Sequence, residues 1–230
     1  MSLQDQLLKT LYDAGAALVG IADLRDVPNA EFPFGVSVAL PLEKHIVKDL
    51  LTAPTEEYHA AYHELNRQLN EIVLAGERFL KKQGYRAFAQ IKDNAVPVDE
   101  TLHFPMPYKT VATRAGLGWI GKNALLVTAE YGCAVRIATL FTDAPLEAAV
   151  PVTKSLCGSC TACVDACPAG ALHGALWDGE TKREELVDVA RCEVKMREIM
   201  RESTGIDFDI CGKCFAVCPY TQRWLKAPII

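Results

Sequence analysis

The chain has 230 residues, 50% of them hydrophobic and 23% charged, and a formal net charge of −5 at pH 7. This length can bury a sizeable core, and the acidic balance argues against a nucleic-acid surface or a polybasic membrane patch. No apolar run approaches the ~18–20 residues that cross a bilayer, and the N-terminus lacks the basic start and apolar core of a signal peptide. We therefore expect a cytoplasmic globular protein that binds no membrane and no nucleic acid.

Both helices and strands are expected over the first 91 residues. Leucines recur on one helical face between Ser2, a favoured capping residue, and Gly15, which predicts a helix at 2–14. The further expected elements are strands at 17–22, 36–42 and 85–91 and a long amphipathic helix at 56–82.

Prolines and glycines punctuate the middle of the chain. The segment 92–108 has three prolines and no hydrophobic period, so we expect a loop or a cleft-lining segment there. The elements expected after it are strands at 124–128 and 134–141, a turn at Tyr131-Gly132 and a proline-containing linker at 143–155. The overall prediction is an α+β domain at 1–150 followed by a cysteine-rich domain at 151–230.

Eight of the nine cysteines lie between Cys157 and Cys218, and in a reducing compartment such clustering indicates metal ligation. The first run, C-x2-C-x2-C-x3-C-P from Cys157, is the full bacterial ferredoxin pattern, in which the fourth thiolate binds the other cluster. The second run has Phe208 at its first position, and Cys192, in a helix expected at 182–200, can supply the missing ligand. The predicted ligands are Cys157, Cys160, Cys163 and Cys218 for one [4Fe–4S] cluster, and Cys167, Cys192, Cys211 and Cys214 for the other.

Three features near this module have alternative interpretations. Four-cysteine zinc sites are common, but zinc ribbons rarely use this spacing. The ninth cysteine, Cys133, opens an apolar strand and is interpreted as a small core residue, with a cleft-facing ligand as the alternative. His59 and His63, spaced i and i+4, could chelate a metal, but their acidic neighbours favour a solvated helix face.

The segment Ala115–Asn123, AGLGWIGKN, contains G-x-G-x-x-G and also G-x-x-x-x-G-K. A dinucleotide site needs a strand before it and a helix after it, and this context is not evident. A phosphate-binding loop needs Ser or Thr where Asn123 stands. A glycine-rich turn that packs Trp119 and Ile120 into the core remains a third interpretation.

The same segment and several other motifs of the chain resemble the epoxyqueuosine reductase family. The other motifs are Pro105 before the segment, Thr142-Asp143-x-Pro145-Leu146 after it, the early Asp13-Ala-Gly-x3-Val-Gly-Ile-Ala22, and the cluster module with Arg191-Cys192. The resemblance implies a nitroreductase-like, B12-chaperone-like α+β domain stacked on a two-cluster ferredoxin-like domain. It also implies electron transfer from the clusters to a cobalamin or another corrinoid, whose reduced cobalt is the reactive centre. The expected corrinoid-lining residues are Gly116, Leu117, Gly118, Trp119, Ile120, Gly121, Lys122 and Asn123.

The chain departs from the family at the proton donor. Where tRNA-reducing members carry an acidic residue, alignment places Leu102-His103-Phe104, and a family glutamate falls at Tyr108. His103 and Tyr108 are therefore the candidate catalytic proton donors, with a loop histidine and a packed aromatic as their structural alternatives. The helical-repeat tail of those enzymes is also missing after Ile230, so we expect a substrate other than tRNA.

The leading hypothesis from the sequence is an iron–sulfur oxidoreductase that delivers low-potential electrons to a corrinoid in an interdomain cleft. Its expected partners are an electron donor such as ferredoxin or flavodoxin and a small-molecule or protein-bound substrate. Two alternatives remain: a non-catalytic electron-transfer or corrinoid-activating protein that docks a partner, and a flavin in place of the corrinoid.

Overall fold

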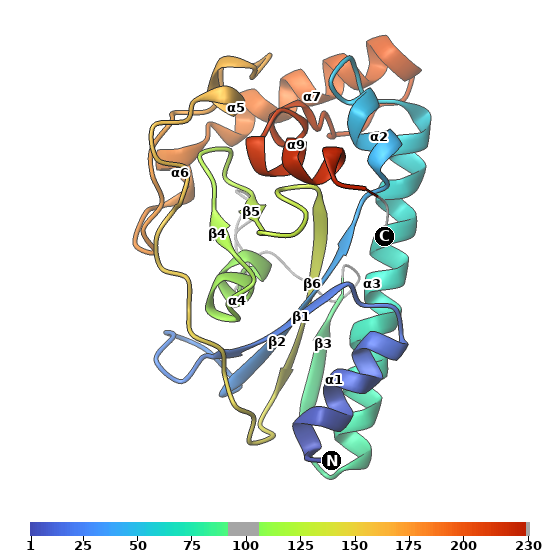
Figure 1. Ribbon diagram of the computed structural model, residues 1–230, viewed down its shortest axis with the longest axis vertical. Coiled ribbons are helices and arrows are strands. Elements are labelled where there is room, and N and C mark those ends of the chain that lie inside the picture. Colours follow the sequence, from blue (N-terminus) through green and yellow to red (C-terminus); the bar gives the residue numbers. More distant parts are fainter. Residues whose placement is uncertain (92–105, 229–230) are drawn as a thin grey trace. The chain divides into compact units, whose positions relative to one another are not determined.

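The computed structural model describes residues 1–91 and 106–228 (Figure 1). Packing divides the chain into two compact units. The sheet unit comprises Met1–Leu40, Glu64–Leu117 and Arg136–Val152, and the cysteine unit comprises Pro41–His63, Gly118–Val135 and Thr153–Ile230. Each unit is thus built from three separate stretches of sequence.

A four-stranded sheet with the strand order β1-β2-β6-β3 forms the centre of the sheet unit. The strands are β1 (Leu18–Asp23), β2 (Phe34–Pro41), β3 (Ala87–Gln90) and β6 (Val135–Thr142). Strands β1 and β2 pair antiparallel, with Leu18 opposite Ala39, and β3 and β6 also pair antiparallel. The two longest strands, β2 and β6, therefore lie in the middle, where both of their faces can be covered.

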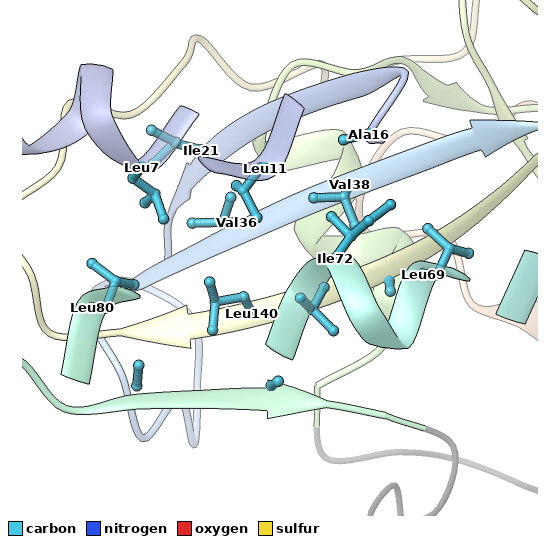
Figure 2. Close-up of a cluster of buried hydrophobic side chains, with 14 of the residues drawn as sticks. Leu7, Leu11, Ala16, Ile21, Val36, Val38, Leu69, Ile72, Leu80 and Leu140 are labelled. Atoms are coloured by element: carbon cyan, nitrogen blue, oxygen red, sulfur yellow. The ribbon is translucent and has the colours of Figure 1, made fainter. Parts of the chain in front are cut away.

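Helices α1 (Leu3–Asp13) and α3 (Glu56–Lys82) cover one face of this sheet. Figure 2 shows the core between them, where Leu11 of α1 and Ile72 of α3 lie over Val38 and Leu140. The start of α1 has a full capping box, because the Ser2 hydroxyl accepts the N–H of Asp5 while the Asp5 carboxylate accepts the N–H of Ser2.

Helix α4 (Tyr108–Arg114) packs on the opposite face, because residues that alternate with the first core, such as Ala22 and Phe141, contact Val111. Two strand glycines allow this approach. A Cβ on Gly20 would lie 2.3 Å from the carbonyl oxygen of Ala115, and one on Gly35 would lie 2.7 Å from Val111. Side chains at these positions would push α4 off the sheet.

The cysteine unit consists of short elements. They are α2 (Lys44–Asp49), the antiparallel pair β4 (Trp119–Ile120) and β5 (Leu126–Val127), and helices α5 (Ala162–Asp165), α6 (Arg183–Leu186), α7 (Val189–Thr204), α8 (Lys213–Ala216) and α9 (Pro219–Lys226). Helix α7 begins where the Asp188 carboxylate accepts the N–H of Arg191, and it ends at Gly205, whose φ is +77°.

Most of the predicted elements are present, with three differences. The helix expected at 182–200 is two helices, since Asp188 caps a new one after the extended Val187. Helix α4 begins within the segment predicted as a loop, and the rest of that segment, 92–105, lies outside the described residues. The domain boundary was predicted between residues 150 and 151, and the chain passes from the sheet unit to the cysteine unit between Val152 and Thr153. The cysteine unit also includes residues 41–63 and 118–135, which the prediction assigned to the first domain.

None of the helices in the described ranges is both long and apolar enough to cross a membrane.

Candidate metal centre

The two cysteine runs fold into equivalent local structures. Cys163 lies in the short helix α5 and Cys214 in the short helix α8, and these two helices pack against each other. Each run then ends in a Cys-Pro pair, at Cys167 and Cys218. Local sequence similarity is therefore matched by local geometry, although Phe208 replaces a cysteine in the second run.

One group of thiols gathers around Cys163. Burial raises the pKa of Cys163 to about 11, and the neighbouring thiols of Cys157, Cys218 and Cys160 contribute to the increase. Three of these four cysteines come from the first run and one, Cys218, comes from the second. This is the composition predicted for the first cluster.

A second group gathers around Cys192 and Cys214. Burial raises the pKa of Cys192 to about 11, and Cys167 and Cys211 contribute to the increase. Burial also raises the pKa of Cys214 strongly, and its neighbours are Cys211, Cys192, Cys163 and Cys167. Cys167 of the first run thus lies among the thiols of the second, and the two groups adjoin.

In the described part of the chain, no three His, Cys, Asp or Glu side chains converge as ligands of one metal ion would. A [4Fe–4S] cubane does not need such convergence, because its four thiolates bind four different iron atoms. The assignment of each cysteine to a cluster stays a prediction.

Cys133 lies beside this centre. Its side chain is 4% exposed, which confirms the predicted burial, and its thiol adjoins that of Cys218 closely enough for each to shift the pKa of the other. The contact with Cys133 lowers the pKa of Cys218, and the backbone N–H groups of Thr221 and Tyr220 at the start of α9 lower it further. The same contact and burial raise the pKa of Cys133. The contact between the two cysteines was not predicted, because nothing in the local sequence pattern around Cys133 indicates it.

A glycine brings Cys133 to this position. Gly132 has a φ of +60°, and a Cβ on it would lie 2.2 Å from the backbone nitrogen of Thr221. The bare backbone allows the Cys133 N–H to donate to the Thr221 hydroxyl at 3.0 Å. The turn that ends at Cys133 is thereby attached to the first turn of α9.

Phe208, at the position of the missing ligand, packs against aromatic side chains of α3. Its ring centroid lies 4.8 Å from that of His59, 5.2 Å from that of His63 and 5.3 Å from that of Tyr62. The two histidines also approach each other, with 3.2 Å between their Nε2 atoms. This face of α3 is therefore a packing surface for Phe208, which the interpretation as a solvated face did not include.

The glycine-rich segment crosses from one unit to the other. Gly116 and Leu117 belong to the sheet unit, and Gly118–Asn123 belong to the cysteine unit, where Trp119 and Ile120 form β4. The chain itself fills the space beside two of the glycines. A Cβ would lie 2.0 Å from the Val127 carbonyl oxygen at Gly118 and 2.7 Å from Asn123 Oδ1 at Gly121.

One buried donor of this segment lacks an acceptor among the described residues. Trp119 Nε1 has no hydrogen-bond partner, although the indole ring packs edge-on against Tyr220 with 4.8 Å between ring centroids. Buried polar groups are normally satisfied, so this donor is suited to a ligand that carries an acceptor. Lys122, three residues further along, is buried as well, with 7% of its surface exposed.

Of the two candidate proton donors, His103 lies outside the described residues. Tyr108 opens α4, is half-buried, and donates its hydroxyl to the carbonyl oxygen of Gln90 at 3.3 Å. Burial raises the pKa of Tyr108 above its usual value, so the phenol stays protonated at neutral pH.

Comparison with known proteins agrees with the cysteine pattern. Residues 156–221 match the family described as a 4Fe-4S double cluster binding domain. The epoxyqueuosine reductase of Lactococcus garvieae is 36% identical over 168 residues, which cover 73% of this chain and 42% of the relative. The epoxyqueuosine reductase of Vibrio cholerae is 31% identical over 170 residues, which cover 70% of this chain and 40% of the relative.

The chain is a homologue of the epoxyqueuosine reductases. It spans less than half the length of these curated relatives. Iron–sulfur binding is accordingly a property of the family domain that residues 156–221 form.

Two kinds of solved structure share the fold. A catabolic reductive dehalogenase, NpRdhA, in complex with 3-bromo-4-hydroxybenzoic acid, has a TM-score of 0.73 at 18% identity, covering 94% of this chain and 31% of that one. An epoxyqueuosine reductase with an epoxyqueuosine-modified tRNA stem loop has a TM-score of 0.64 at 23% identity, covering 96% and 65%. The second of these structures contains a modified tRNA stem loop, and the expectation that nucleic acid is an unlikely partner of this chain is not supported.

Proposed function

We propose that this protein is an iron–sulfur oxidoreductase that passes low-potential electrons through two [4Fe–4S] clusters to a corrinoid held by its glycine-rich segment and a nitroreductase-like sheet unit. An external donor of the ferredoxin or flavodoxin type would load the clusters. The sheet with helices on both faces and the family membership support this proposal.

The observation that carries the proposal is the grouping of the thiols. Besides burial, thiols of its own run and Cys218 raise the pKa of Cys163, while Cys167 of the other run and Cys211 raise that of Cys192. An exchange of the last cysteine between two runs is the arrangement in two-cluster ferredoxins. Clusters that share their ligand loops in this way lie close enough to exchange electrons.

The crossed arrangement is tested by iron analysis and EPR of the anaerobically reconstituted protein. The wild type should hold about eight iron and eight sulfide ions per chain, four of each per cubane. Cys167→Ser should damage the same cluster signal as Cys211→Ser, while Cys157→Ser damages the other signal. If Cys167→Ser instead affects the signal that Cys157→Ser affects, each run binds its own cluster and the crossed scheme is wrong.

The corrinoid is supported by the family and by a structural neighbour, a reductive dehalogenase whose structure suggests a mechanism for B12-dependent dehalogenation. When bound, a corrinoid supplies a cobalt centre that is strongly reactive once reduced. The unpartnered Trp119 Nε1 and the ammonium group of Lys122 would bind acceptors on its rim. Tyr108, kept protonated by its burial, would hold a transferable proton near the reacting atoms.

Titration with cob(II)alamin, followed by EPR, tests this part. A five-coordinate, base-off signal at micromolar protein is expected, and Lys122→Met should weaken binding while the iron content stays at the wild-type level. If no such signal develops but the clusters remain redox-active, the protein is an electron carrier or activator that docks a partner. A flavin absorbance spectrum in the purified protein would indicate that the cofactor is a flavin and not a corrinoid.

The substrate can be approached through the ligands of the structural neighbours. An epoxyqueuosine-modified tRNA stem loop and a brominated hydroxybenzoate are the two probes to offer to the reduced, corrinoid-loaded protein. Turnover of one of these probes would assign the substrate class. If the protein turns over neither probe, the substrate is a different small molecule or a protein-bound group, as expected from the sequence.

A further inference from the structure

A hollow in the surface of the cysteine unit lies between α7 and the turn that follows Cys167. Its volume is about 460 Å³, and Pro168 and Ala169 line it from the turn. The α7 side chains of the hollow form one stripe at helical spacing, namely Ala190, Arg191, Val194, Lys195 and Glu198. Both walls thus adjoin a predicted ligand of the second cluster, because Cys167 precedes Pro168 and Cys192 follows Arg191.

The turn and the helix meet at Arg191. The Gly170 N–H donates to the carbonyl oxygen of Cys167 at 3.0 Å, and the Ala171 N–H donates to Cys167 Sγ at 3.4 Å. Gly170 has a φ of +55°, and a Cβ on it would lie 3.3 Å from Arg191 Nη2. The guanidinium therefore lies over the backbone of the turn that holds Cys167, so a molecule in the hollow would be one turn of chain away from this thiol.

Apolar and charged side chains meet in the hollow. Val194 is 68% exposed, which is high for a branched apolar side chain. Lys195 Nζ lies 2.7 Å from Glu198 Oε2, and a partly exposed pair of this kind is weak enough to exchange partners. With Arg191, the lining carries two cations and one carboxylate, on a chain whose net charge is −5. Apolar contact bordered by charge is typical of the small interfaces of transient electron-transfer complexes.

The glycine-rich segment contacts the unit at the other cluster. The Trp119 ring packs against Tyr220, with 4.8 Å between ring centroids, and the Cys133 N–H donates to the Thr221 hydroxyl at 3.0 Å. Tyr220 and Thr221 closely follow Cys218 in the chain. Electrons that leave for a group held by the glycine-rich segment therefore leave from the cluster of Cys218, and the cluster beside the hollow is the one that receives them.

We propose that the hollow is the docking site of an acidic, low-potential electron-carrier protein, whose carboxylates contact Arg191 and Lys195 while an apolar edge covers Val194. This inference rests on the proposed function. For a flavin carrier, the anionic flavin hydroquinone loses one electron and becomes the neutral semiquinone, and the cluster of Cys167 and Cys192 gains that electron, so no proton is transferred. Opposite charges on the two surfaces accelerate association and orient the carrier.

The test uses a flavodoxin as the probe and the full, anaerobically reconstituted chain. Carbodiimide links amines to carboxylates that touch them, so oxidised flavodoxin should be cross-linked to Lys195, as mapped by mass spectrometry. In stopped-flow measurements with flavodoxin hydroquinone, Lys195→Glu should lower the second-order rate constant of cluster reduction about tenfold at low ionic strength. Reduction by dithionite, which needs no docking surface, should keep its wild-type rate.

Lys82→Glu is the matched control, because it makes the same charge change at an exposed position at the end of α3. It should keep the wild-type rate with both reductants. Val194→Ser leaves the charge unchanged and should raise the dissociation constant for oxidised flavodoxin about threefold, because less apolar surface is buried. This variant retains Arg191 and Lys195, so it also tests the surface if Lys195→Glu does not fold.

Equal rates for Lys195→Glu and Lys82→Glu, or cross-links confined to other lysines, would overturn the docking site. Binding of a tRNA stem loop that Lys195→Glu abolishes would assign the hollow to nucleic acid instead, and a dimer that Val194→Ser dissociates would assign it to a second copy of the chain. If dithionite reduces the clusters and flavodoxin does not, the proposed function stands and only the docking inference is rejected. If neither reductant reduces a cluster, the proposed function itself is wrong.

Discussion

Replacing Gly132 by alanine should destabilise the cysteine unit by about 2–5 kcal/mol. The first contribution is the backbone, since a φ of +60° costs a residue with a Cβ about 1–2 kcal/mol. The second is steric. The added methyl group would lie 2.2 Å from the backbone nitrogen and 2.6 Å from the Cα of Thr221, and overpacking of this kind costs about 1–3 kcal/mol. These atoms belong to the helix backbone and cannot rotate away.

Gly205→Ala is the matched control. Gly205 lies in the same unit with a φ of +77°, and no atom lies within 4 Å of its missing Cβ. It should therefore lose only the backbone contribution, about 1–2 kcal/mol.

Urea denaturation under anaerobic conditions, followed by circular dichroism, compares the two variants. At an m-value of about 2.5 kcal/mol/M, the Gly132→Ala midpoint should fall by about 1–2 M, and by less than about 1 M for Gly205→Ala. Comparing matched variants limits the influence of the metal on the unfolding transition. Equal midpoints for the two variants would refute the close approach of Gly132 to α9.

Two further predictions concern the core and the metal. Leu140→Ala should lower the free energy of unfolding by about 2–5 kcal/mol, because the Leu140 side chain is fully buried. Phe88 is partly exposed, so Phe88→Ala should lower it by less than about 1 kcal/mol, and equal denaturation midpoints for the two variants would contradict this prediction. Iron chelation should increase amide hydrogen exchange in residues 157–167 and 211–218, whose helices are only four residues long, while strand β2 stays protected. An equal loss of protection in β2 and in the two cysteine segments would contradict this prediction.

Features that depend on local sequence were predicted well. Helix α3 runs from Glu56 to Lys82 as its apolar periodicity indicated, and Ser2 caps α1. The cysteine spacing likewise predicted a two-cluster iron–sulfur domain, and residues 156–221 match a 4Fe-4S double cluster binding domain. In each of these cases the signal lies within a few residues, or in a motif whose geometry is fixed by its own loop.

Features that depend on contacts between distant segments could not be read in this way. The strands β4 and β5 have two residues each, too few for an alternating pattern. The contact of Cys133 with Cys218, and the packing of Phe208 on His59, join segments that are far apart in the sequence. Only the folded arrangement brings these side chains together.

The interleaving of the two units has a consequence for synthesis of the protein. The sheet unit has all its segments once residue 152 has been made, so it can fold while the chain is still being translated. Segments 41–63 and 118–135 can pack into the cysteine unit only after residues 153–230 have been made. Long stretches of chain separate these segments, so bringing them together is entropically costly and slow. A fragment that begins at residue 153 would lack Gly132 and Cys133 beside α9. Cluster insertion thus has its complete protein framework only after Cys218 and α9 have been made, and until then the nascent chain would benefit most from a chaperone.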